Sequence, residues 1–190
     1  GFHRHTMEGL YRGDFINCPV LYNPYRHISD QFLALVDAME SPTVPKNKFE
    51  TDGRIPKEAP GLRLKPGELE AMEKRLLGDF PVIGGRKLVL IYPSGGILPI
   101  RAWPLGHFCR LAEALVEKGC VVSVIGLPAD KHLAQAIQDH CRSPLCIDMT
   151  GYTKTIRELL VIFHLASLLV TNDGGPGQFA VMTPIRSILL

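Results

Sequence analysis

The sequence of 190 residues predicts an α/β fold, a doubly wound parallel sheet with helices on both faces. From residue 86 onward, runs of apolar residues alternate with stretches that have helical periodicity. The apolar runs contain few polar residues, which is typical of parallel strands buried on both faces. Short loops join each run to the next helix, and such connections favour right-handed crossovers.

Two helices are expected before this alternating region. The first covers 28–39, with Ser29 as its N-cap, and the second is an amphipathic helix over 68–77 that is stopped by Gly78. A linker over 41–66 is predicted between them, because prolines stand among its charged residues. The later elements are expected in this order: strand 87–92, helix 104–118, strand 121–125, helix 130–140, strand 145–148, helix 155–166, strand 168–171, a short helix from 176 and strand 185–190.

Composition narrows the class of protein. The chain is 46% hydrophobic and 21% charged, so it is expected to fold around a core. A net charge of +2 does not indicate a nucleic-acid or membrane-surface binder. No apolar run reaches the roughly 18 to 20 residues of a membrane span, and the first residues do not resemble a secretory leader. Five cysteines without a C-x-x-C pair favour an intracellular setting, so a cytoplasmic protein is expected.

The stretch from Leu168 to Ala180 predicts a turn that can bind phosphate. An apolar strand stops at Asn172-Asp173, glycines follow, and Pro176 stands where a helix begins. Glycines let a ligand approach the backbone closely, and the start of a helix offers unpaired N–H groups to an anion. A tight turn without any ligand is the alternative for this stretch alone.

A second turn of the same kind favours the phosphate hypothesis. After strand 87–92 come Ser94, Gly95 and Gly96, and Arg101 follows shortly before the next helix. A hydroxyl, accessible backbone amides and a forked guanidinium group are all suited to phosphate. A solvated surface charge is the alternative for Arg101.

The loops at 94–101, 126–130, 149–151 and 173–178 should all lie at the carboxyl ends of the strands, where ligands bind in such folds. The predicted contacts of a diphosphate are Ser94, Gly95, Gly96, Arg101, Gly174, Gly175, Gly177 and Gln178. The predicted contacts of a base, ribose or sugar are Asp130, Met149, Thr150, Gly151 and Asp173. Two of these keep an alternative, because Asp130 could simply cap its helix and Asp173 could brace the glycine turn.

Three motifs in this order resemble those of glycosyltransferase family 9, the heptosyltransferase-like enzymes that build bacterial lipopolysaccharide. They are Arg101 two places before Trp103-Pro104, then Asp148-Met149-Thr150-Gly151, and then the element from Asn172 to Ala180. The resemblance covers residues 60–190 well and the first 60 weakly. It departs from the family at Gly174, where Ser is frequent, and at Gln178, where His is frequent, so no charged group is available at the latter position.

The resemblance implies the Rossmann-like C-terminal half of a two-domain GT-B glycosyltransferase. Such an enzyme binds a nucleotide-diphosphate sugar and transfers the sugar to lipopolysaccharide or another glycan. Residues 1–65 would be the tail of the N-terminal acceptor domain plus a Pro-rich linker, and residues 66–190 the donor domain. The chain has no initiating Met and stops before the family's Phe-Gly-Pro loop, so a fragment is expected. The catalytic base is expected in the N-terminal domain, and the whole protein is expected to be peripheral at the inner membrane.

No metal and no cofactor other than the donor is expected. Residues 80–190 contain neither an Asp-x-Asp sequence nor a cluster of His, Asp and Glu with the spacing of metal ligands. The charge of a leaving diphosphate would then be met by hydrogen-bond donors of the protein.

Two other functions remain open at this stage. Gly175-Pro176-Gly177 with Ala180 fits the dinucleotide-binding fingerprint of NAD-type proteins, although it occupies the last strand–helix unit instead of the first. A non-catalytic nucleotide-binding module is the other alternative, which Gly174 and Gln178 make conceivable. Protection by a nicotinamide dinucleotide would favour the first, and nucleotide binding without sugar transfer would favour the second.

Overall fold

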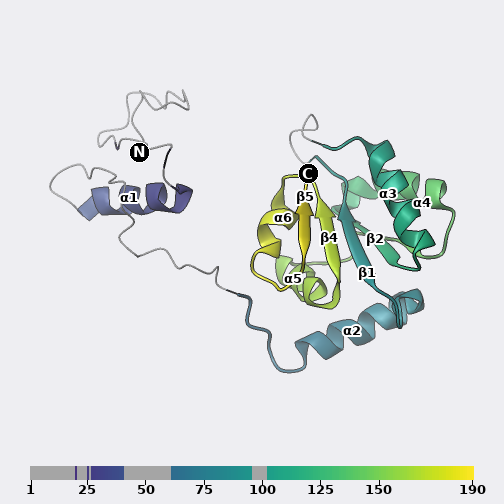
Figure 1. Ribbon diagram of the computed structural model, residues 1–190. Helices are drawn as coiled ribbons and strands as arrows, with labels where there is room; N and C mark the ends of the chain where they lie inside the picture. The colour runs from purple at the N-terminus through teal and green to yellow at the C-terminus, as the bar shows by residue number, and fades with distance from the viewer. Residues whose placement is uncertain (1–19, 21–24, 26, 41–60, 96–101) are drawn as a thin grey trace. The chain divides into compact units, whose positions relative to one another are not determined.

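The computed structural model describes residues 20, 25, 27–40, 61–95 and 102–190. The chain divides into two compact units, Gly1–Glu58 and Ala59–Leu190, which are considered separately (Figure 1). The first unit contains helix α1 (Ile28–Glu40). The second contains the sheet and every other described helix.

Helix α1 begins at Ile28, as predicted, but it is not capped by the predicted residue. Ile28 is already helical, so Ser29 lies within the first turn, and the prediction that Ser29 caps the helix is wrong. His27 takes this place, because its Nδ1 accepts the Ser29 N–H at 3.2 Å and its carbonyl oxygen accepts the Asp30 N–H at 3.0 Å. The imidazole thus satisfies an N–H group that the helix itself leaves unpaired.

Helix α2 (Glu68–Asp79) runs through Gly78, so the prediction that this glycine ends the helix is also wrong. The helix ends because Pro81 opens the short 3-10 turn η1 (Pro81–Ile83). A residue that precedes proline disfavours the helical conformation, and Phe80 accordingly has φ −134° and ψ 73°. Its N–H still closes the last turn on the Leu76 carbonyl at 2.7 Å.

Five parallel strands form one sheet in the order β3-β2-β1-β4-β5. They are β1 (Leu88–Tyr92), β2 (Val121–Gly126), β3 (Cys146–Thr150), β4 (Leu168–Thr171) and β5 (Ser187–Leu189). The chain builds outward from β1 through β2 to β3 and then returns to β4 on the other side of β1. The strand order therefore reverses between β1 and β4, and the predicted doubly wound parallel sheet is confirmed.

Helices cover both faces of this sheet, as Figure 1 shows. They are α3 (Leu105–Glu117), α4 (Lys131–Cys141), α5 (Ile156–Leu165) and α6 (Gly175–Ala180). One core lies under α3 and α4 and includes Ile91 and Phe108, while a larger core lies under α2, α5 and α6 and includes Leu90 and Phe163. Each of these side chains is fully buried, which stabilises the fold by about 1.5–3 kcal/mol per residue.

A pair of charged side chains holds α2 against α5. The Arg157 guanidinium donates two hydrogen bonds to the Glu68 carboxylate, one of 2.6 Å from Nε and one of 2.7 Å. The Lys65 N–H donates a third to the same carboxylate at 2.9 Å. Arg157 first, and then the Lys65 N–H, lower the pKa of Glu68 to about 2.

We predict that Glu68→Gln destabilises the protein at neutral pH and removes part of its sensitivity to acid. A carboxylate whose pKa falls from 4.5 to about 2 on folding stabilises the folded state above pH 4.5, and this contribution is lost as the pH drops toward 2. Chemical denaturation from pH 7 to 2.5 measures the effect, with Glu70→Gln, an exposed residue of the same helix, as the control. A difference between wild type and Glu68→Gln that stays constant across this range would contradict the prediction.

Candidate functional site

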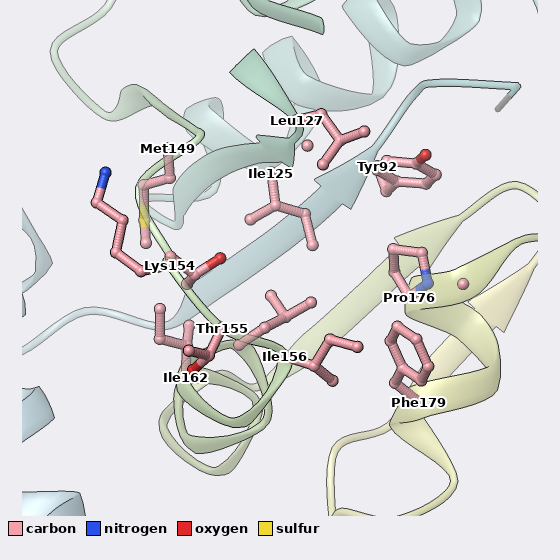
Figure 2. A pocket seen from close by; sticks show the side chains of 14 residues that line it. Tyr92, Ile125, Leu127, Met149, Lys154, Thr155, Ile156, Ile162, Pro176 and Phe179 are labelled. Atoms are coloured by element: carbon pink, nitrogen blue, oxygen red, sulfur yellow. The ribbon is translucent and has the colours of Figure 1, made fainter. Parts of the chain in front are cut away.

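A pocket of about 350 Å³ lies at the carboxyl ends of β1, β2 and β3, beside the first turns of α5 and α6. Figure 2 shows Ile125, Ile156 and Phe179 converging on it from three separate segments. Its walls are mainly apolar, and Thr153, Lys154 and Thr155 add polar groups. Among the described residues that line it, Lys154 alone carries a charge. Apolar walls with a few polar groups are typical of small-ligand sites.

The loops that follow β2 and β3 pack against each other beside the pocket. The Gly151 N–H donates to the Gly126 carbonyl at 2.8 Å, and Gly151 has a φ of +68°, which favours glycine. A Cβ atom at Gly151 would lie only 2.9 Å from the Pro128 ring, so a side chain there would push the two loops apart. This packing places Met149 in the pocket wall.

The neighbouring polar groups of these loops bond mainly within the loops. The Thr150 N–H and hydroxyl both donate to one oxygen of Asp148, at 2.8 and 2.7 Å. Asp130 is nearly buried, and its carboxylate accepts the Leu127 N–H at 2.8 Å. Asp130 stands at the N-cap position of α4, but its side chain bonds back to Leu127 and makes no capping bond to that helix. It therefore fixes the turn between β2 and α4.

The start of α5 fixes the polar side of the pocket. The Thr155 hydroxyl accepts the Glu158 N–H at 3.1 Å, and the Glu158 carboxylate accepts the Lys154 N–H at 2.6 Å. The pKa of Glu158 is lowered, chiefly by the hydrogen bond from the Lys154 N–H. These reciprocal bonds resemble a capping box and hold the backbone of Lys154 beside the pocket.

Asn172 connects the two glycine-containing turns. Its side chain is buried after β4, and Oδ1 accepts the Trp103 N–H at 2.9 Å. Its Nδ2 donates to the carbonyl oxygens of Pro93 and Ser94 at 3.0 and 3.2 Å. The loop after β1 and the loop after β4 thus meet at this side chain, as their common edge of the sheet predicts.

Of the residues predicted from the sequence, Met149 and Gly175 line the pocket. Ser94, Gly95, Asp130, Thr150, Gly151, Asp173, Gly174, Gly177 and Gln178 lie in the loops and helix starts at the same edge but do not line it. Gly177 is buried, and a Cβ atom there would lie 3.2 Å from Thr171 and 3.3 Å from Leu189, so it allows α6 to approach β4 and β5. Gly96 and Arg101 lie outside the described residues, and the ligand contacts of all these residues stay predictions.

Sequence reasoning missed most of the pocket wall. Tyr92, Leu127, Thr153, Lys154 and Phe179 all line the pocket and belong to no predicted contact set. Leu127 lies inside the predicted loop 126–130, and each of the others lies within a few residues of a predicted loop, which is their only signal in the sequence.

No three His, Cys, Asp or Glu side chains gather as potential metal ligands in the described part of the chain. Within that same part, no helix is long and apolar enough to cross a membrane.

Residues 33–184 match the sequence model of glycosyltransferase family 9 (heptosyltransferase). The chain belongs to this family. Among curated relatives, it is 29% identical over 161 residues to the lipooligosaccharide heptosyltransferase 2 of Haemophilus influenzae. The aligned region covers 80% of this chain and 42% of the relative. It is 26% identical over 119 residues to the lipopolysaccharide heptosyltransferase 2 of Salmonella typhimurium, covering 61% of this chain and 33% of the relative.

Two solved structures have the same fold. The E. coli ADP-heptose lps heptosyltransferase II superposes with a TM-score of 0.69 at 18% identity, over 92% of this chain and 51% of the other. The glycosyl transferase family 9 protein of Veillonella parvula superposes with a TM-score of 0.65 at 18% identity, over 86% of this chain and 43% of the other. The chain thus spans about half the length of the family members that it matches.

Proposed function

We propose that this chain is the donor-binding half of a heptosyltransferase-type glycosyltransferase, and that its pocket holds a nucleotide-diphosphate sugar. The observation that carries the proposal is the position of the pocket in a member of family 9. It lies at the carboxyl edge of a doubly wound sheet, next to the point where the strand order reverses. Ligands of open α/β sheets bind at such a point.

The apolar walls of the pocket suit the flat faces of an aromatic ring such as a nucleobase. Ile125 and Met149 present apolar surface from the ends of two neighbouring strands, and Leu127 adds a side chain that is 69% exposed to solvent. Lys154 supplies a positive charge for the diphosphate or its sugar, and a charge-assisted hydrogen bond contributes about 1.5–3 kcal/mol. Gly175 leaves its backbone accessible beside them.

In the proposed reaction, the bond between the sugar's anomeric carbon and the diphosphate breaks, and its electron pair stays on the departing nucleoside diphosphate. An acceptor hydroxyl forms the new bond to that carbon, and its proton passes to a base. This chain stabilises the leaving diphosphate through hydrogen-bond donors that the fold holds in place, such as backbone N–H groups, and through the positive charge of Lys154. The base and the acceptor-binding surface are assigned to the part of the protein that this chain does not span, and the acceptor is lipopolysaccharide or a related glycan.

Calorimetry with ADP tests the proposed pocket, since ADP is the nucleotide part of the donor named for the E. coli relative. We predict that Leu127→Ala weakens ADP binding about fivefold, because it removes one apolar wall worth about 1 kcal/mol. Stability should change by less than about 0.5 kcal/mol, because the side chain is largely exposed. Val181→Ala is the matched control, because Val181 is 62% exposed and lies outside the pocket.

Either of two results would overturn this assignment. One is a wild-type chain that does not bind ADP, and the other is an equal effect of Leu127→Ala and Val181→Ala on ADP affinity.

Sugar transfer by the intact enzyme should not require a divalent metal. The described residues include no cluster of metal ligands near the pocket, and the proposed donors neutralise the leaving group without an ion. The rate of transfer in the presence of EDTA measures this. Loss of activity with EDTA and its recovery with Mg²⁺ would show that the proposed leaving-group stabilisation is wrong.

We also predict that the 190-residue chain alone does not transfer sugar. Transfer needs a base and a second surface that orients the acceptor, and we assign both to the part of the family members that this chain does not span. Incubation of the purified chain with donor and acceptor, followed by detection of released nucleoside diphosphate, tests this. Turnover above that of an Asp173→Ala, Lys154→Ala double variant would place catalytic groups on this chain.

A further inference from the structure

The side chain of Asn172 is fully buried, and both hydrogens of its amide are donated. Its Oδ1 accepts one N–H, from Trp103, and its Nδ2 donates both hydrogens, to Pro93 and Ser94. These partners stand at the two ends of one connection, since Pro93 and Ser94 follow β1 and Trp103 precedes α3. One side chain from the loop after β4 therefore holds both ends of the loop after β1.

We infer that Asn172 is a positioning residue for the nucleotide site, an inference that rests on the proposed function. Without its amide, the buried Pro93 carbonyl would lose its donor, and the half-buried Ser94 carbonyl and Trp103 N–H would each lose the hydrogen bond that ties them to the loop after β4. The cost of an unmet buried carbonyl is large enough to shift the backbone at Pro93 and Ser94. Ser94 and Gly95 lie in this loop, so its position sets where their polar groups stand relative to the pocket. Small displacements of such groups weaken ligand binding strongly.

The chemistry of this position requires an amide and not merely a polar residue of the same shape. Aspartate has the same size and could still accept the Trp103 N–H, but its ionised form cannot donate to the two carbonyl oxygens. Once protonated, it can donate to one of them. Burial beside two carbonyl groups favours the protonated form and raises the pKa of such an aspartate.

The test is Asn172→Asp, with ADP affinity measured by calorimetry at pH 8 and at pH 5.5. We expect binding roughly tenfold weaker than wild type at pH 8, and recovery to within about threefold at pH 5.5, because the protonated acid restores a donor. Asn172→Ala should bind weakly at both pH values. His107, which stacks on Trp103, and the adjacent Asp173 are present in every variant, so each affinity is compared with that of wild type at the same pH.

A substitution at a second buried polar residue serves as the control. It shows whether any change in the core of the sheet weakens ADP binding, or only the loss of the Asn172 hydrogen bonds. Ser123 lies in the middle of β2, and its hydroxyl is the only buried side-chain polar atom without a partner among the described residues. Ser123→Ala should leave ADP affinity unchanged at both pH values. Wild-type affinity in Asn172→Asp at pH 8, or equal losses at both pH values, would overturn the inference.

Two further measurements follow Trp103 itself, the first of them in the wild-type chain. The Trp103 amide is bonded to a buried side chain, so it should exchange with deuterium at least about a hundredfold more slowly than an unprotected amide. Trp103 is also the only tryptophan of the chain, so its emission should shift in Asn172→Asp at pH 8 and return at pH 5.5. A protected amide in a chain that does not bind ADP would overturn the proposed function alone. A freely exchanging amide would overturn the role of Asn172.

Discussion

The common direction of the five strands is the constraint on which the candidate site depends. Because the sheet is entirely parallel, the loops that leave β1 to β4 all emerge at one edge. The strand order reverses between β1 and β4, so the helices that follow these two strands lie on opposite faces. The loops after β1 and β4 therefore meet between the two faces, where Asn172 joins them with three side-chain hydrogen bonds.

Much of the fold could be predicted because its signals are local. The run Leu88–Tyr92 is apolar at every position, and such a run has few alternatives to a buried parallel strand. Local signals failed where two of them competed. Gly78 permits a helix to end but does not force it, whereas Pro81 restricts the residue before it, so the helix stops there. At α1 the competing signals were two possible caps, and the His27 imidazole, not the Ser29 hydroxyl, occupies the position before the helix.

The site was harder to predict, because its groups are brought together by long-range contacts. Asn172 is 69 residues from Trp103 and 79 from Pro93, and nothing in the neighbouring sequence specifies that its amide binds them. The apolar wall is hidden for another reason. Ile125 belongs to the end of β2 and has the sequence pattern of a core residue, and only the three-dimensional fold shows that it borders a pocket. Glycine-containing turns indicate the edge, but not the pocket beside it.

The glycines of α6 fit both the family 9 motif and a dinucleotide-binding fingerprint, but close packing against the sheet is enough to explain Gly177. Gly175 and Gly177 match the spacing of a dinucleotide-binding fingerprint, but Gly177 faces Thr171 and Leu189, and a Cβ atom there would lie within 3.2–3.3 Å of their side chains, which is tight packing. This requirement for close packing exists with or without a ligand. The match to the fingerprint therefore adds little support for a dinucleotide, and the family 9 match across residues 33–184 carries the assignment. A packing glycine at this position also explains why the short α6 can lie close to β4 and leave its first turn beside the pocket.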